Sequence, residues 1–423
     1  MNNNKLIYKT RSVCPYCLKT VYADVSAHPD GVYMDKVCRQ HGSFSTLIWD
    51  DTEENYLRWL SFGGIDVSAL PKTEEQCDEY LSGASFRSEA EQLPVSSALM
   101  STNRCNMNCP VCFTRDKKEA LYEPDYDECK KLMLEYRARA GSDAIIEFCG
   151  GEPTVRDDLP ELAGLAKNMG FDFVQLNTNG IRLSQSPEYC RCLKKSGVTT
   201  VYLGFDGFSD GAYFAKYARN LLNVKLKAVE NCKKVGLAIV LVCCVIPGEN
   251  DMELGDIVRY AKANMPAVKG IYLQPISYFG IYPPDKIRRI TIPTVIRRLC
   301  DQCREIKPEH FCPSDYEHPQ CSFNATYMLG KDGKLTALSR FSGRTRSGES
   351  LSRLRKNLRL TWLPGDRNLL SIGGMAFQDC WNIDLARVRR CSVQIIQKDG
   401  RLIPLCSKYL SGINGEKIFP GIG

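Results

Sequence analysis

The central part of the chain alternates short β-type segments with amphipathic helical segments. From residue 96 onward, runs rich in β-branched and apolar residues alternate with stretches in which apolar residues recur every three or four positions. The predicted strands span 96–102, 144–149, 172–177, 199–205, 238–245 and 270–275, and the predicted helices span 125–139, 158–169, 187–196, 219–235, 252–264 and 293–305. Each strand–helix unit has about thirty residues, the length of a βαβ unit. The pattern therefore predicts an α/β protein whose parallel strands close into a barrel or partial barrel, with its site at the carboxyl ends of the strands.

The regions on either side of this pattern differ from it, and they divide the chain into four predicted parts. Residues 1–65 contain short β-type runs followed by an amphipathic helical segment, and residues 66–95 are polar and charged, as is typical of a linker. Residues 96–305 hold the strand–helix units, and residues 306–423 form a second cysteine-rich region.

Length and composition fit a protein with a large buried core. The chain has 423 residues, 43% of them hydrophobic, which is enough for two or three domains. It contains no run of about eighteen apolar residues and no charged-then-apolar leader before Lys5-Leu6-Ile7-Tyr8. We therefore expect no transmembrane segment and a cytoplasmic location.

Cysteine usage and charge narrow the possible functions. There are 21 cysteines, an odd number, and without an export signal metal ligation is favoured over a disulfide framework. The net charge of +7 has well-mixed signs, which suits a solvated surface or the docking of an acidic electron carrier. Residues 49–54 are acidic where a nucleic-acid zinc ribbon carries basic and aromatic residues, so no nucleic-acid partner is expected.

Three cysteines follow the first predicted barrel strand. Cys105, Cys109 and Cys112 have the spacing C-x3-C-x2-C. A tight loop can fold three such thiolates onto one face of an iron–sulfur cubane. Because no fourth cysteine follows closely, one iron stays open to a small chelating molecule. For this spacing alone, a chance cluster or a three-ligand zinc site is the alternative interpretation.

The other predicted strands also end in residues that suit a ligand. The second leads into Gly150-Gly151-Glu152-Pro153, where bare glycine backbone permits close approach and the carboxylate suits an ammonium group. The later strands lead into Thr178, Asp206, Asn250 and Gln274. Each residue alone has an ordinary turn or helix-cap explanation. Their succession around one barrel mouth favours a binding site.

The ordered pair of C-x3-C-x2-C and Gly-Gly-Glu-Pro, one strand–helix unit apart, resembles the radical S-adenosylmethionine (radical SAM) superfamily. The resemblance implies a partial (β/α)6 TIM barrel and a [4Fe-4S] cluster on Cys105, Cys109 and Cys112. It also implies S-adenosylmethionine as cofactor, with Glu152 on its amino group. Such enzymes cleave this cofactor reductively to a 5′-deoxyadenosyl radical, which takes hydrogen from unactivated carbon. The ligand contacts expected by resemblance, or from position at the mouth, are Gly150, Gly151, Pro153, Thr178, Asp206, Asn250 and Gln274.

A second metal site is predicted near the amino terminus. Cys14-Pro15-Tyr16-Cys17 and Cys38-Arg39-Gln40-His41 are two tight turns about twenty residues apart. Cys14, Cys17 and Cys38, with His41 as the nearest fourth ligand, suit zinc or a single iron. Free thiols on a small β-ribbon are the alternative.

The C-terminal region predicts an auxiliary iron–sulfur cluster. An Asp399-Gly400 turn between two apolar runs marks a hairpin, which would set Cys391 and Cys406 near each other at its base. The preferred ligands are Cys321, Cys391 and Cys406, with Cys312 as the fourth. Reduced core or surface thiols are the alternative.

Nearly the whole chain resembles a narrower group, the tetraether lipid synthases and the class D radical SAM methyltransferases that act on pterins. The resemblance is carried by C-P-x-C…C-x-x-H-G, by His318-Pro319-Gln320-Cys321-Ser322, and above all by the tail from Gly374-Met375 to Pro404-Leu405-Cys406. It implies carbon–carbon bond formation between lipid chains or methylation of a small molecule, with a flavodoxin- or ferredoxin-type electron donor. Three other interpretations stay open: a peptide-modifying enzyme, a sulfur-inserting enzyme, and a non-enzymatic iron–sulfur or zinc protein with a vestigial barrel.

Overall fold

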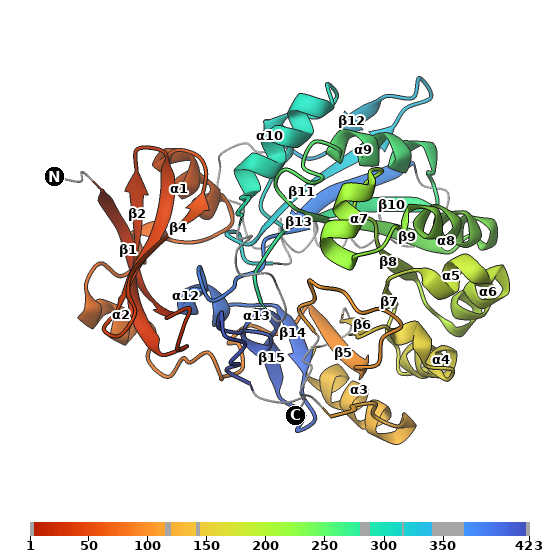
Figure 1. Ribbon diagram of the computed structural model, residues 1–423, viewed down its shortest axis with the longest axis horizontal. Coiled ribbons are helices and arrows are strands. Elements are labelled where there is room, and N and C mark those ends of the chain that lie inside the picture. Colours follow the sequence, from red (N-terminus) through yellow and green to blue (C-terminus); the bar gives the residue numbers. More distant parts are fainter. Residues whose placement is uncertain are drawn as a thin grey trace.

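Two β-sheets organise the chain, and the N-terminal one is small and antiparallel (Figure 1). The computed structural model describes residues 4–114, 120–140, 144–279, 288–314, 317–340 and 368–419. The small sheet has the order β1-β2-β3-β4. Its strands are β1 (Lys5–Val13), β2 (Thr20–His28), β3 (Gly31–Cys38) and β4 (Gly42–Trp49), followed by α1 (Glu53–Phe62), η1 (Val67–Ala69) and α2 (Glu74–Tyr80).

The second sheet contains the predicted barrel strands in sequential, parallel order. They are β5 (Ser96–Thr102), β6 (Ile145–Gly150), β7 (Phe173–Thr178), β8 (Thr200–Gly204), β9 (Ala238–Val245) and β10 (Val268–Pro275). The helices between and after them are α3 (Tyr126–Ala140), α4 (Leu159–Asn168), α5 (Ile181–Gln185), α6 (Pro187–Ser196), α7 (Asp210–Tyr217), α8 (Leu222–Val235), α9 (Leu254–Ala263) and α10 (Ile292–Gln302). The predicted partial barrel of strand–helix units is confirmed.

Local sequence explains where these helices begin and end. In α6, the Ser186 side chain accepts a hydrogen bond from the main-chain N–H of Tyr189, and Pro187 occupies the first turn. The helix ends at Gly197, whose left-handed φ of 112° favours glycine. The predictions missed α5 and α7, and they extended α8 toward its N-terminus and α10 toward its C-terminus.

The C-terminal residues add strands to both edges of the barrel sheet. The full order is β12-β11-β13-β10-β9-β8-β7-β6-β5-β14-β15. β13 pairs in parallel with β10, and β14 pairs in parallel with β5 at the opposite edge. Among the described residues, the other elements are η2 (Pro153–Val155), η4 (Pro308–His310), β11 (Ser322–Leu329), β12 (Leu335–Ala337), β13 (Leu369–Met375), α12 (Leu385–Val388), β14 (Val393–Ile396), β15 (Leu402–Pro404) and α13 (Leu405–Lys408). Beyond residue 306 the chain therefore shares the barrel's own sheet, and the four-part division stays a prediction.

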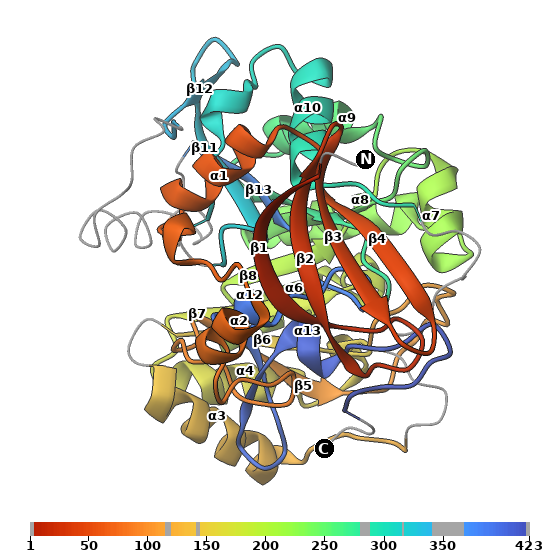
Figure 2. The same ribbon diagram turned by 90° about the vertical axis from the view of Figure 1, so that its left-hand side faces the viewer.

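The small sheet rests on the C-terminal segment beside the barrel (Figure 2). The Asp384 carboxylate accepts hydrogen bonds from the Tyr8 hydroxyl at 2.7 Å and the Thr10 hydroxyl at 2.6 Å. The Trp59 indole N–H donates to the main-chain oxygen of Pro319 at 2.8 Å. These buried contacts tie the N-terminal unit to the segments around Cys321 and α12.

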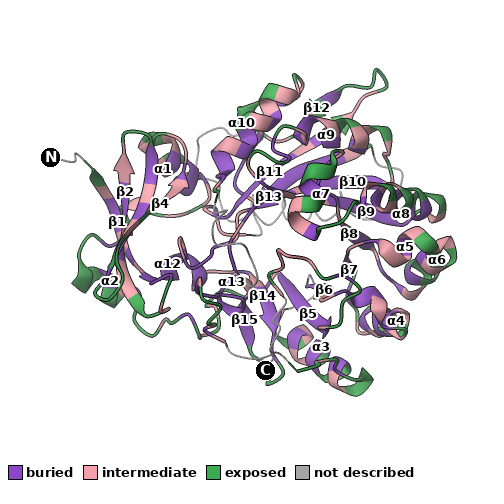
Figure 3. Cartoon of the chain, in the orientation of Figure 1, coloured by how far each residue is buried: buried purple, intermediate pink, exposed green. Residues whose placement is uncertain are grey.

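The strands of the large sheet form the most buried layer of the molecule (Figure 3). Phe148, Leu176, Leu203 and Leu241 are fully buried on the face that packs against the helices. Residues between them point to the opposite face because successive side chains of a strand alternate. That inner face surrounds the barrel lumen.

Candidate functional site

The three cysteines of the C-x3-C-x2-C motif lie on the loop that follows β5. Desolvation raises the pKa of the Cys105 thiol, and nearby Glu152, Cys109 and Cys112 raise it further because each repels the thiolate. Desolvation also raises the pKa of Cys109, whereas Lys216 and Lys225 oppose that shift. The loop thus gathers three thiols, a carboxylate and two cations within electrostatic range at the barrel mouth.

Gly150 and Gly151 allow the end of β6 and the residues just after it to pack directly on the cysteine loop. The main-chain N–H of Gly151 donates to the oxygen of Thr102, and that of Glu152 donates to the oxygen of Arg104, each at 2.8 Å. A Cβ atom at Gly150 would overlap the Thr102 oxygen, and one at Gly151 would overlap the Arg104 oxygen. The bare backbone of the two glycines therefore permits the close approach of the cysteine loop itself.

Glu152 is buried, and hydrogen bonds fix the position of its carboxylate. The hydroxyls of Thr154 and Thr178 donate to Oε1 at 2.6 Å each, and the main-chain N–H of Asn179 donates to Oε2 at 2.7 Å. Pro153 is buried at the start of η2. Thr178, predicted as a ligand contact, lies where it orients Glu152.

Asp206 is fully buried, and its carboxylate holds two side chains that the sequence interpretation missed. Lys216 Nζ lies 3.0 Å from Oδ1, and the Tyr217 hydroxyl donates to Oδ2 at 2.7 Å. The main-chain N–H of Cys244 also donates to Oδ1, at 2.8 Å. Desolvation disfavours the charge on Lys216, but Asp206, Tyr217 and Cys244 together outweigh it and raise the Lys216 pKa well above its usual range. The sequence signal that could have identified these two side chains is α7, an aromatic-rich segment after the Asp206-Gly207 turn.

The two other predicted ligand contacts, Asn250 and Gln274, differ in their surroundings. Asn250 is buried, and its side-chain amide donates to the main-chain oxygens of Asp206 at 2.7 Å and Cys244 at 2.9 Å. It also accepts from the main-chain N–H of Ile246 at 2.7 Å. Asn250 thus orders the loop after β9, whereas Gln274 lies half-buried at the end of β10.

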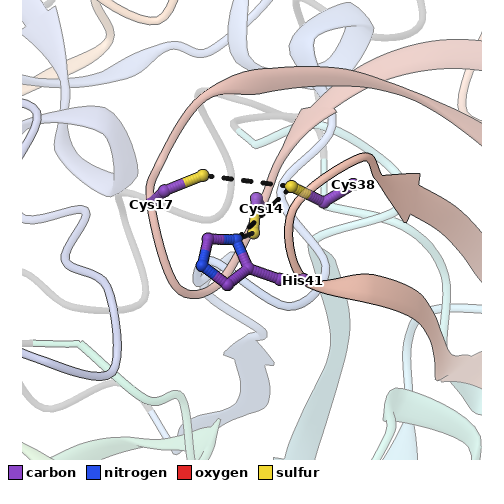
Figure 4. Close-up of side chains that lie close together, drawn as sticks. All are labelled: Cys14, Cys17, Cys38 and His41. Atoms are coloured by element: carbon purple, nitrogen blue, oxygen red, sulfur yellow. Dashed lines mark hydrogen bonds between the residues drawn. The ribbon is translucent and has the colours of Figure 1, made fainter.

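The predicted N-terminal metal ligands converge at one point (Figure 4). The ligand atoms of Cys14, Cys17, Cys38 and His41 lie within 4.8 Å of one another. His41 Nδ1 lies 3.5 Å from the sulfurs of Cys14 and Cys38, and the sulfurs of Cys17 and Cys38 lie 4.0 Å apart. Hydrogen bonding from the Gln40 backbone and from His41 lowers the pKa of Cys38 to about 6. Three thiolates and an imidazole at this spacing suit a tetrahedral zinc site.

Replacing Cys38 with serine should remove one metal ion per chain without affecting iron. Serine removes a low-pKa sulfur ligand from a four-ligand site, so affinity for the ion should fall steeply. Metal analysis by mass spectrometry of the purified variant measures this loss. Cys77→Ser is the control, since this thiol lies on α2 and is buried in an apolar cluster. A variant that keeps its zinc while losing iron would contradict the assignment.

Three of the four predicted auxiliary ligands line one cavity. Cys321 follows His318-Pro319, Cys391 precedes β14, and Cys406 lies in α13. The predicted hairpin is confirmed, because β14 and β15 pair antiparallel with Gln394 opposite Pro404. The fourth predicted ligand, Cys312, does not line this cavity, and its main chain pairs with Asn324. His318 lines the cavity instead.

Arg387 places a buried positive charge at the wall of this cavity. It is 5% exposed, and its Nη2 donates to the Cys321 sulfur at 3.0 Å. Its Nε is buried with no hydrogen-bond partner among the residues that the structure describes. A buried donor without a partner is costly, so the cavity suits an occupant that carries acceptors, as the sulfides and thiolates of a cluster do.

The barrel, the cysteine loop packed on a glycine-rich strand end, and the buried glutamate define a radical SAM protein. A family model described as the radical SAM superfamily matches residues 99–261, and one described as the HMPTM N-terminal zinc ribbon domain matches residues 6–50. The 7,8-dihydro-6-hydroxymethylpterin dimethyltransferase of Methanocaldococcus jannaschii is 33% identical over 94% of this chain and 92% of its own length. The chain belongs to the radical SAM family that contains this methyltransferase.

Other similarities are more distant. The Fe-coproporphyrin III synthase of Methanosarcina barkeri is 31% identical over 33% of this chain and 34% of its own length. The crystal structure of Streptococcus suis SuiB bound to the precursor peptide SuiA covers 96% of this chain and 85% of its own, with 11% identity and a TM-score of 0.48. Within the described residues, no helix combines the length and the hydropathy needed to cross a membrane.

Proposed function

We propose that the chain is a radical SAM methyltransferase that attaches a one-carbon unit to a carbon atom of a pterin-type heterocycle. The methyltransferase from M. jannaschii, whose name gives a dihydropterin as its substrate, aligns over nearly the whole chain. The observation that favours a pterin over a lipid is a pair of hydrogen-bonded polar side chains on the inner face of the barrel. Glu147 and Asn177 lie on its inner face and are partly accessible, whereas isoprenoid chains would require an apolar tunnel.

In this proposal the mouth residues bind S-adenosylmethionine beside a [4Fe-4S] cluster on Cys105, Cys109 and Cys112. Ligands of a cubane bind different irons, so they need not lie as close together as the ligands of a single ion. When bound and reduced, the cluster supplies the electron that splits the cofactor into methionine and a 5′-deoxyadenosyl radical. Glu152 would bind the amino group of the cofactor, and Lys216, held by Asp206, its carboxylate. A flavodoxin- or ferredoxin-type protein would donate the electron.

The cavity lined by Cys321, Cys391 and Cys406 is the proposed site of an auxiliary iron–sulfur cluster. The buried Arg387 supports this assignment, since its Nη2 contacts a candidate ligand sulfur and its Nε needs an acceptor. Cys312 was the fourth ligand predicted from the sequence, and His318, which lines the cavity, is a second candidate. The cluster would lie between the barrel lumen and the zinc-ribbon unit.

Replacing Cys391 with alanine should remove the auxiliary cluster alone. Iron should fall by about four atoms per chain after anaerobic reconstitution, while the EPR signal that responds to S-adenosylmethionine should persist. Cys312→Ala and His318→Ala, measured in parallel, identify the fourth ligand by the same iron loss. Full iron content in Cys391→Ala would contradict the assignment.

A product assay tests the proposed function. The reduced, anaerobic enzyme is incubated with S-adenosylmethionine, 7,8-dihydro-6-hydroxymethylpterin and a cell extract that supplies one-carbon donors. Mass spectrometry should detect 5′-deoxyadenosine and a pterin that has gained one or more methyl groups. An unchanged pterin, together with coupled chains when an isoprenoid lipid is added, would overturn the proposal in favour of lipid coupling.

A further inference from the structure

Four polar or aromatic side chains lie on the inner face of the barrel strands, apart from the residues proposed to bind the cofactor. Positions on the inner face of β6, β7, β8 and β10 are partly accessible, whereas their immediate neighbours in the strands are buried. The residues at these positions are Glu147, Asn177, Tyr202 and Tyr272. They come from separate strands and face one another because they share the inner face.

Glu147 is held in a fixed orientation by neighbouring strands. The Ser96 hydroxyl of β5 donates to Oε1, and the Asn177 side-chain amide of β7 donates to Oε2 at 3.3 Å. Gln175 donates to the Asn177 side-chain oxygen at 2.8 Å, which orients the Asn177 amide toward Glu147. A carboxylate offers about four acceptor directions. The two side-chain donors therefore leave capacity for two more hydrogen bonds on the same carboxylate.

Two tyrosines and a second carboxylate complete the lumen. The rings of Tyr202 and Tyr272 lie 5.7 Å apart between centroids at an interplanar angle of 51°. The Tyr272 hydroxyl donates to Glu317 Oε1 at 3.1 Å. Glu317 also lines the cavity of Cys321, Cys391 and Cys406. The aromatic pair thus lies between the strand that carries Glu147 and the proposed auxiliary cluster.

We propose that Glu147 binds a ring that presents two adjacent N–H donors, the edge of a 2-amino-4-oxopyrimidine as in pterins, with the Tyr202–Tyr272 pair packed against one side of the ring. This inference rests on the proposed function and names the group that recognises the substrate. A carboxylate pairs with two parallel donors in a bidentate arrangement, and flat aromatic side chains favour contact with a flat heterocycle.

The electrostatics of the lumen agree with this role. Desolvation raises the pKa of Glu147 above its usual range, and Ser96 and Asn177 only partly oppose the shift. Desolvation also raises the pKa of Glu317, and the nearby Glu147 charge raises it further. A ligand that donates two hydrogen bonds would offset the cost of the Glu147 charge, whereas an apolar ligand would increase it.

The test compares binding of two ligands to two forms of the holoenzyme with S-adenosylmethionine present. The ligands are 7,8-dihydro-6-hydroxymethylpterin and its analogue without the 2-amino group, measured by anaerobic equilibrium dialysis. The wild type should bind the pterin about 10- to 100-fold more tightly than the analogue, because the analogue lacks one of the two donors that pair with the carboxylate. Glu147→Gln should weaken pterin binding by a similar factor and bind both ligands about equally.

Two controls separate the possible failures. Glu161→Gln changes an exposed glutamate on α4 and should bind both ligands as the wild type does. Circular dichroism and iron content of Glu147→Gln should match those of the wild type, because the substitution preserves the size and shape of the side chain, so a loss of binding would not report a loss of fold or of clusters. A wild type that binds the pterin but does not discriminate against the analogue would overturn this inference alone. A wild type that binds neither ligand would overturn the proposed function and this inference with it.

Discussion

Replacing Cys105 with alanine is expected to reduce formation of 5′-deoxyadenosine to the uncatalysed background. The loop offers three sulfur ligands for the cluster, and one iron must stay open for the cofactor. Loss of one thiolate leaves two protein ligands, so the cluster should not assemble, or should not hold the cofactor beside a reducible iron. The measurements are chromatography of the nucleoside product and EPR of the dithionite-reduced protein.

The same variant should keep its other metal sites. The metal content predicted for Cys14, Cys17, Cys38 and His41 should be unchanged, because these residues lie on the small sheet. Cys192→Ala is the matched control, since Cys192 is an exposed thiol on α6. Normal 5′-deoxyadenosine production by Cys105→Ala would contradict the assignment of the loop, and loss of activity in Cys192→Ala would indicate general damage by cysteine replacement.

The sequence was sufficient to predict those features that depend on local pattern and spacing. The barrel strands could be identified because alternating and continuous apolar runs recur at the length of a βαβ unit. The hairpin between Cys391 and Cys406 followed from the Asp399-Gly400 turn, and Gly400 indeed has a left-handed φ of 80°. The convergence of Cys14, Cys17, Cys38 and His41 followed from two turns of known spacing.

Features that depend on long-range packing could not be predicted in this way. β13 and β14 are close in sequence, yet they pair with β10 and β5 at opposite edges of the parallel strands. No periodicity in either strand specifies its partner. Likewise, Asp206 follows a strand end as a ligand residue would, but its carboxylate is occupied by Lys216 and Tyr217 from α7. Contacts between elements that are far apart in the sequence decide which polar residue faces the ligand and which one supports it. The sequence alone does not show these contacts.

The packing of Gly151 on the cysteine loop leads to the second prediction of large effect. Gly151→Ala would place its methyl group against the Arg104 main-chain oxygen and within 2.7 Å of that of Asn103. Both atoms belong to backbone, which cannot yield as a flexible side chain does. Unlike Gly150, whose φ is 132°, Gly151 does not have a left-handed φ, so the substitution tests packing alone. The loop should shift away from β6 and misplace the three sulfurs.

We therefore expect Gly151→Ala to lower 5′-deoxyadenosine formation by about 100-fold or more, since misplacement of a reacting group by about 1 Å has effects of that size. Gly164→Ala is the matched control. Gly164 lies inside helix α4, and a Cβ there would meet only the Ser196 oxygen, at 3.7 Å. Alanine should leave that helix intact or stabilise it by up to about 1 kcal/mol. Circular dichroism and zinc content should be normal in both variants, so the loss in Gly151→Ala would report the position of the loop. Equal activity in the two variants would mean that the glycine does not hold the cysteine loop in place.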